Sequence, residues 1–365
     1  MTTGQFLDTV GMEFEGAGIS LRSLGRFSEE NRNLHSTRDA SVESNVSALG
    51  NGMLLNTNSI IAQTLRVDRN NTYGYELVTV PLLREEVPAI LADIVFQAQG
   101  LGDYISPRAS IHIHVGFAYN LNLIKKALAI GLAYDPLLFM LAGMGTEYRG
   151  NFNASIYARP LEAGVAVPIG GDIVHLLPEM GLDCKSTEDF WNRFLIFSGV
   201  NRYHPGRYFA TNLYASLLHS TLEFRHFNQC FNTRYIGAVI NLCQALTRLA
   251  NSSSLDEILQ ERITTVFEMK RGDGEIYIER LLKLLSKYKI PLINSDVNSL
   301  MDILDNTKIP KFSRKVPLTH ISSSRNNLGT KHWMKFLRAD DCVHSGYTDI
   351  HNISQKEISV LDEEY

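Results

Sequence analysis

The sequence has few cysteines, and none of them are paired at short spacing. The four lie far apart, at positions 184, 230, 243 and 342, and no C-x-x-C occurs. Small secreted domains and cysteine-ligated zinc sites both need clustered cysteines. The pattern therefore excludes a disulfide framework and a cysteine-based zinc site, and it is typical of a reduced protein inside the cell.

Long hydrophobic runs are absent as well, and so is a basic segment followed by an apolar core near residue 1. The most apolar stretch, residues 123–145, is interrupted by Lys125-Lys126 and by Asp135-Pro136. Neither piece reaches the roughly 20 apolar residues that a membrane-spanning helix needs. We therefore expect buried helices, no signal peptide, no membrane partner and a cytoplasmic location.

The chain has no excess of positive charge, since 35 Lys and Arg residues stand against 39 Asp and Glu residues, a formal net charge of −4. Nucleic-acid-binding domains are usually basic, so we expect no nucleic-acid partner. The phosphate-binding loops GxxxxGK[ST] and GxGxxG do not occur either. Any nucleotide must therefore be held by other means.

The spacing of apolar residues predicts strands and helices in mixed rather than alternating order, which favours an α+β protein with an antiparallel sheet flanked by helices. The expected strands lie at 5–15, 74–82, 110–117, 207–215 and 220–228. The expected helices lie at 84–100, 187–199 and 234–250, in two pieces over 120–145 that separate at Asp135-Pro136, and in three pieces over 254–305. We expect a catalytic domain over 1–250, a helical extension over 251–305 and a polar tail over 306–365.

One pattern recurs on three of these strands: two ionisable residues two positions apart, backed by bulky apolar residues. The pairs are Glu13 and Glu15, His112 and His114, and Glu223 and Arg225. Alternate residues of a strand share a face, and burying unpaired charge is costly. We therefore predict that the three strands are neighbours, and that their polar sides meet in one floor of three carboxylates, two imidazoles and a guanidinium.

Carboxylates packed so closely raise one another's pKa unless a cation neutralises them. Ligation by carboxylates with a minority of histidine suits Mg²⁺ or Mn²⁺. Mg²⁺ is usually shared with substrate phosphates, and arginine binds phosphate through two parallel hydrogen bonds, so a nucleotide is the expected ligand. A zinc hydrolase would need more histidines than carboxylates. A small-barrel dioxygenase would need a carboxylate soon after H-x-H, which VGFAYN (115–120) lacks.

The motifs GMEFEG, RDAS, GYELVTVPL, SIHIHVG, RYFATN and TLEFRHF follow one another over roughly residues 8–250. Together they resemble the amidoligase family, carboxylate–amine ligases of the glutamine synthetase and glutamate–cysteine ligase superfamily. The resemblance implies a glutamine synthetase-like catalytic fold, in which one face of an antiparallel sheet binds metal and nucleotide. It also implies an ATP-dependent ligase that joins a carboxylate and an amine through an acyl phosphate, with ATP and Mg²⁺ (or Mn²⁺) as cofactors.

The same resemblance gives roles to single residues. Glu13, His112 and Glu223 would share the metal nearest the transferred phosphate. A second metal would be held by Glu15 and Glu76, with Asp39 nearby. His114 would face the ATP phosphates, and Arg225 would stabilise the transferred phosphoryl group, so the expected catalytic residues are Glu13, Glu223 and Arg225. Arginines outside these strands also match family positions: Arg202 and Arg207 as phosphate- or substrate-binding residues, and Arg149 and Arg159.

Two features depart from the family pattern. Ala109-Ser110 stands where members often have Cys-Gly, and the interval from Asp39 to Glu76 is long. Two other functions stay open at this point. The same floor could serve a metal-dependent hydrolase with water as the nucleophile, or the fold could be a non-catalytic binding or structural module. The sequence alone does not identify the substrates or the oligomeric state.

Overall fold

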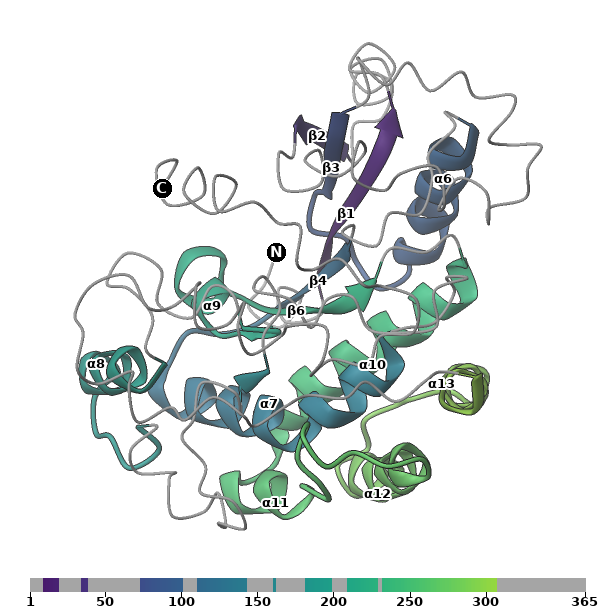
Figure 1. Ribbon diagram of the computed structural model, residues 1–365. Coiled ribbons are helices and arrows are strands. Elements are labelled where there is room, and N and C mark those ends of the chain that lie inside the picture. The colour runs from purple at the N-terminus through teal and green to yellow at the C-terminus, as the bar shows by residue number, and fades with distance from the viewer. Residues whose placement is uncertain are drawn as a thin grey trace.

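The computed structural model describes residues 9–19, 34–38, 73–100, 110–142, 160–161, 181–198, 209–228 and 232–306. These residues form three layers: a sheet, two long helices packed beneath it, and a further set of helices below those (Figure 1). The arrangement confirms the α+β class with an antiparallel sheet.

The described strands form one six-stranded sheet in the order β2-β3-β1-β4-β6-β5. Their bounds are β1 Val10–Ile19, β2 Leu34–Arg38, β3 Tyr73–Thr79, β4 Ser110–Gly116, β5 Thr211–Asn212 and β6 Thr221–Asn228. Every pairing is antiparallel. β1, β4 and β6 are direct neighbours, as their shared pattern of ionisable pairs predicted.

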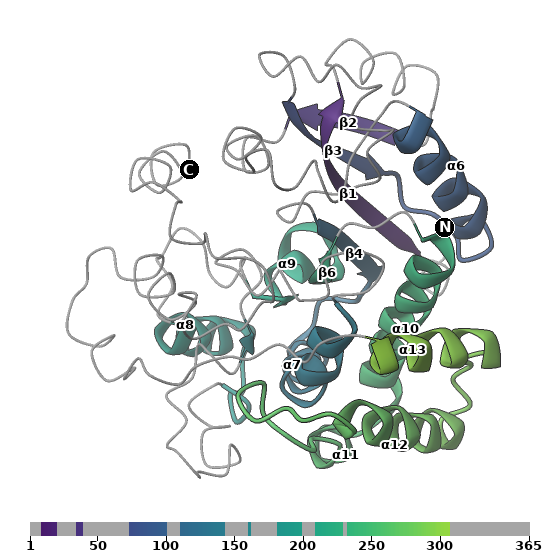
Figure 2. The same cartoon turned by 45° about the vertical axis from the view of Figure 1, so that its right-hand side comes forward.

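The buried face of the sheet explains why these strands form. Eight apolar residues of β1, β4 and β6 are at most 2% exposed: Val10, Met12, Phe14, Ile111, Ile113, Val115, Leu222 and Phe224. The long helices α7 (Leu121–Leu141) and α10 (Thr233–Ser252) pack against this face, and α6 (Val87–Gly100) lies beside α10 (Figure 2). Apolar side chains that alternate along the strands therefore turn the ionisable ones to the opposite, open face.

The register between β4 and β6 contains a β-bulge. Ile113 is opposite Phe224, but Ile111 is opposite Phe227, so two residues of β6 face the single His112. A bulge of this kind re-aims side chains locally. Here Arg225 binds Glu223 on the open face, whereas the next residue, His226, binds Asp135 of α7 on the core face.

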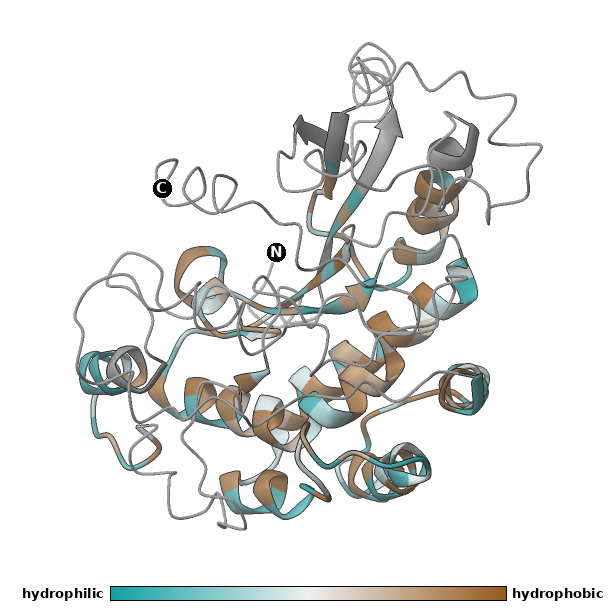
Figure 3. Cartoon of the chain, in the orientation of Figure 1, coloured by the Kyte–Doolittle hydropathy of each residue, from teal (hydrophilic) through white to brown (hydrophobic). Residues whose placement is uncertain are grey.

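The predicted break at Asp135-Pro136 is wrong, because α7 continues through it as one helix. Proline in a helix interior removes one backbone hydrogen bond. In α7 that loss is offset by burial, since residues Ala127–Leu141 are buried without interruption. Figure 3 shows α7 as mainly hydrophobic along its length, whereas α12 and α13 carry both colours.

The strand predicted over 207–215 is wrong from Leu213 onwards. Thr211–Asn212 pairs with β6 and Phe209 forms a single bridge, but α9 (Tyr214–His219) begins two residues after Asn212. The Asn212 side chain accepts a hydrogen bond from the Tyr214 backbone N–H at 2.9 Å. Such a local bond competes with strand pairing and favours a turn.

The remaining helices agree with expectation. α8 (Thr187–Ser198) begins after Ser186, whose hydroxyl accepts from the Asp189 N–H as an N-cap. α11 (Leu255–Gln260), α12 (Asp273–Lys287) and α13 (Asn294–Asn306) are the three predicted C-terminal helices, and they pack onto α7 and α10. The division into domains at residue 250 stays a prediction. Among the described helices, none has the length and apolar content to cross a membrane.

Candidate metal and nucleotide site

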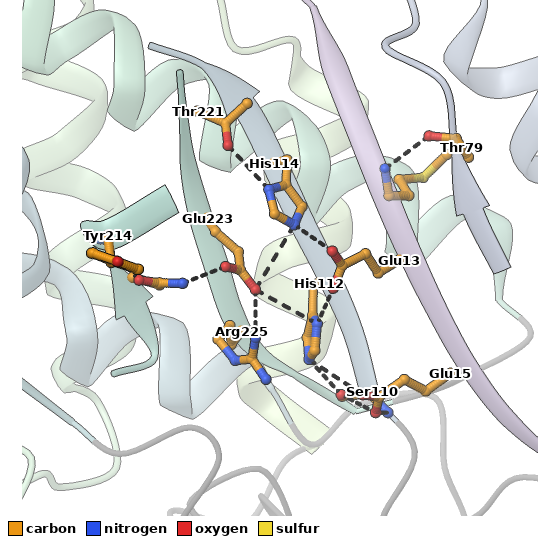
Figure 4. A network of polar contacts seen from close by, with 12 residues as sticks. Glu13, Glu15, Thr79, Ser110, His112, His114, Tyr214, Thr221, Glu223 and Arg225 are labelled. Carbon is orange, nitrogen blue, oxygen red and sulfur yellow. Dashed lines mark hydrogen bonds and ion pairs between the residues drawn. The ribbon is translucent and has the colours of Figure 1, made fainter. Parts of the chain in front are cut away.

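The open face of β1, β4 and β6 carries the predicted floor (Figure 4). Five of its six predicted residues, called the floor from here on, are Glu13, His112, His114, Glu223 and Arg225, whereas Glu15 binds Ser110 beside them. Glu13 lies at the centre of the floor. Its Oε2 is 2.7 Å from His112 Nδ1, and its Oε1 is 3.0 Å from His114 Nε2. Each of these ring nitrogens faces a carboxylate oxygen and donates to it. Glu13 is also the more open acid, with 23% of its side chain exposed against 5% for Glu223.

Glu223 is held by two donors on the far side of the floor. Arg225 Nη1 donates to Glu223 Oε1 at 2.7 Å, and the Asn212 amide donates to Oε2 at 2.5 Å. Both histidines also lie near Oε1, with His112 Nδ1 at 3.6 Å and His114 Nε2 at 3.8 Å. The second carboxylate is therefore fixed in orientation but close to the same nitrogens as Glu13.

Two groups of ion-binding atoms follow from this geometry. Ligand atoms of Glu13, His114 and Glu223 lie within 4.8 Å of one another, and so do those of Glu13, Glu76 and His112. Glu13 belongs to both groups. Carboxylate oxygens with one imidazole nitrogen form a donor set that fits Mg²⁺ or Mn²⁺. The resemblance groups the residues somewhat differently, with His112 beside Glu13 and Glu223, and Glu15 beside Glu76.

Glu15 is turned away from both groups by Ser110. The Ser110 backbone N–H donates to Glu15 Oε2 at 2.8 Å, and its hydroxyl contacts the same oxygen. The Ser110 hydroxyl also lies 2.8 Å from His112 Nε2. Glu15 and Glu76 are opposite each other in the β1–β3 register. The Glu15 carboxylate nevertheless lies near His112, with Oε1 3.7 Å from His112 Nε2. A role for Glu15 as a metal ligand stays a prediction.

Opposing effects set the protonation of the floor. Burial raises the pKa of the Glu13 carboxyl, but hydrogen bonds from His112 and His114 outweigh it and bring that pKa well below its ordinary value. Burial likewise raises the pKa of Glu223, and the charge of Arg225 reverses the sign of the shift. Burial lowers the pKa of His114, but Glu223 and Glu13 raise it above its usual value. These shifts favour ionised carboxylates at Glu13 and Glu223, next to the guanidinium of Arg225 and a His114 that holds its proton more strongly than usual.

Several predicted residues lie outside the described part of the chain: Asp39, Arg149, Arg159, Arg202 and Arg207. Their roles stay predictions. The structure adds supporting residues that the pattern of pairs did not indicate. Asn212 and Ser110 bind the acids, and Thr221 Oγ1 lies 3.1 Å from His114 Nδ1. Each is a short polar residue at a strand end, and only its position in the sheet distinguishes it from other such residues.

No protein-family model and no curated protein matches the chain. Among solved structures, the chain is similar to a bifunctional glutathione synthetase from Pasteurella multocida, with a TM-score of 0.37 and 12% sequence identity. The match covers 93% of this chain and 50% of that protein, so the chain spans about half of its length. A likeness at this TM-score assigns neither a fold family nor an activity.

Proposed function

We propose that the chain is an ATP-dependent carboxylate–amine ligase, which binds ATP and Mg²⁺ (or Mn²⁺) over the floor and forms an amide or isopeptide bond. The observation that carries the proposal is that two groups of ion-binding atoms share Glu13 and adjoin a buried arginine. The motif order, which resembles the amidoligase family, supports the same activity.

In this proposal Glu13, His114 and Glu223 would hold one ion, and Glu13, Glu76 and His112 a second. A bound ion would supply positive charge to the phosphate oxygens of ATP and of the acyl phosphate. Because Glu13 joins both groups, it would fix the spacing between the two ions. Thr221 and Ser110 would orient the histidines, since the second ring nitrogen of a ligating histidine is normally held by a polar partner.

Arg225 would bind the phosphoryl group as it moves. Its side chain is buried, and Glu223 fixes its position through a 2.7 Å hydrogen bond. A guanidinium held rigidly in a site of low dielectric interacts with charge more strongly than it would in water. A substrate carboxylate oxygen attacks the γ-phosphorus and ADP leaves. The amine then attacks the acyl carbon, loses a proton, and phosphate leaves. The residues of the chain act by positioning and by neutralising charge.

The test is a calorimetric titration of ATP with Mg²⁺ into the wild type and two variants, which needs no knowledge of the substrates. Glu223→Gln removes one charge from the floor. Glu279→Gln is the matched control, because Glu279 is an exposed acid of α12 whose carboxylate forms an ion pair with Lys283, far along the chain from the floor. We expect Glu223→Gln to weaken magnesium-dependent binding by about a hundredfold or more.

Binding that is kept in Glu279→Gln and lost in Glu223→Gln would support the ligase proposal and justify a screen of carboxylates and amines. The absence of any binding to folded wild type would contradict it. That outcome would favour an ATP-independent hydrolase on the same floor or a non-catalytic module.

A further inference from the structure

A second polar cluster lies on the opposite, core face of the same sheet. It is centred on Asp135 of α7, which is fully buried. Asp135 Oδ1 accepts from the Thr211 hydroxyl at 2.8 Å and from His226 Nε2 at 2.9 Å, and Oδ2 accepts from the Leu161 N–H at 2.8 Å. One carboxylate thus joins α7 to β5, to β6 and to the turn at 160–161.

The surface of α7 is shaped to receive the same segments. Gly131 lies one helical turn before Asp135 on the same side of the helix. A Cβ at this position would lie 2.2 Å from Leu161 Cδ1 and 3.1 Å from Thr211 Cβ, too close for any other residue without a shift of its neighbours. Gly131 and Asp135 therefore both hold β5 close to α7, one by leaving room and the other by hydrogen bonding.

β5 is a strand of two residues whose side chains face opposite ways. Thr211 points to the core and binds Asp135, whereas Asn212 points to the floor and binds Glu223. The pairing register sets Asn212 directly opposite Glu223, and Arg225 N–H donates to the Ala210 carbonyl at 2.7 Å. So short a strand has few ladder bonds, and the Thr211–Asp135 hydrogen bond therefore anchors the strand that carries Asn212.

We propose that Asp135 is a positioning residue for the floor: it fixes Thr211 from the core face, so that Asn212 holds Glu223 in the orientation that binds a divalent cation. This inference rests on the proposed function, because it assigns Asp135 and Thr211 to the ion site. Partners that orient a metal ligand without touching the metal affect metal affinity about 10- to 100-fold.

The experiment measures Mn²⁺ binding to the full chain by electron paramagnetic resonance, with Mn²⁺ alone as the probe. Thr211→Val removes the hydroxyl and keeps the shape of the side chain. Thr211→Ser keeps the hydroxyl and removes only the methyl group. Thr247→Val is the matched control, since Thr247 is an equally buried threonine of α10 whose hydroxyl bonds only locally, to the Cys243 carbonyl at 2.9 Å. Urea unfolding of each metal-free variant reports its stability separately.

We expect Thr211→Val to weaken Mn²⁺ binding about tenfold, while Thr211→Ser and Thr247→Val bind like the wild type. Asn212→Ala should weaken binding similarly, and the double variant Thr211→Val/Asn212→Ala should be no weaker than the single ones, because both act through Glu223. If Thr211→Val does not fold, Thr211→Ala, which removes the hydroxyl from a smaller side chain, takes its place.

Equal Mn²⁺ affinity in Thr211→Val and Thr247→Val would overturn the positioning role and leave the proposed function standing. Failure of the folded wild type to bind Mn²⁺ would overturn both. A loss of stability in Thr211→Val with unchanged affinity would show that the Asp135 cluster serves the fold alone, and would overturn this inference too.

Discussion

The two faces of one sheet bury ionisable groups in opposite ways. On the core face a single carboxylate, Asp135, accepts from three donors, and the cluster excludes water. On the open face the carboxylates of Glu13 and Glu223 lie close together and share two histidines and one arginine. In the first arrangement both oxygens of one carboxylate accept hydrogen bonds, whereas the second brings together two groups of atoms that fit a cation.

The comparison shows that charge within a sheet does not by itself mark a ligand site. What distinguishes the floor is that acids outnumber fixed cations on a face that solvent reaches through Glu13. In the core cluster one acid meets three donors, and the buried Nδ1 of His226 has no partner among the described residues. The two faces should therefore respond differently to substitution.

The largest expected difference concerns stability. Asp135→Ala should lower the free energy of unfolding by about 3–5 kcal/mol, because three buried donors lose their acceptor. Glu13→Ala should lower it by only about 1 kcal/mol, because 23% of the Glu13 side chain is exposed and water can take the place of its carboxylate beside the two histidines. Urea unfolding of both metal-free variants measures the two effects. Equal losses would mean that the floor is a structural network like the core cluster.

A smaller effect on stability is expected at Ser110, which contacts His112 of the floor and the neighbouring Glu15. Ser110→Ala removes the hydroxyl that contacts Glu15 and His112. We expect a loss of about 1 kcal/mol in stability, because the Ser110 N–H still holds Glu15. Mn²⁺ affinity should fall about tenfold, because His112 loses the hydroxyl that holds its second ring nitrogen. An unchanged affinity in a Mn²⁺ titration would contradict a role for Ser110 in orienting His112.

The smallest effect is a pH dependence in the presence of a chelator. The pKa of His114 is raised in the folded state: burial opposes the shift, but the charges of Glu223 and Glu13 overcome it. The folded chain thus keeps a proton that the unfolded chain releases near pH 6.5. The contribution of His114 to stability is full below that pH and is lost as the pH rises through the raised pKa.

Urea unfolding of wild type and His114→Gln, from pH 6 upwards, measures this contribution. The slope should be shallower in the variant, and Mn²⁺ should bind the wild type more tightly as the pH rises over the same window, because a cation competes with the proton. An identical pH profile in the variant would contradict the assignment to His114.

Much of the site could be predicted because strand periodicity is a local property. Met12 and Phe14 alternate with Glu13, and Ile113 alternates with His112 and His114, so burial of one set turns the other to the open face. The core cluster could not be predicted in this way. Asp135 stands next to a proline in an apolar stretch, which by itself favours a helix break, and its partners come from residues 26, 76 and 91 positions away.

The sequence by itself determined the class of fold, the residues on each side of three strands and the chemical character of the floor, because each follows from spacing within one strand. Tertiary structure alone decided the rest: the bulge that sends Arg225 and His226 to opposite faces, the continuation of α7 through Pro136, and the turn of Glu15 toward Ser110. Each of these depends on which distant groups satisfy a buried polar atom, and contacts of that kind are settled only when the layers pack together.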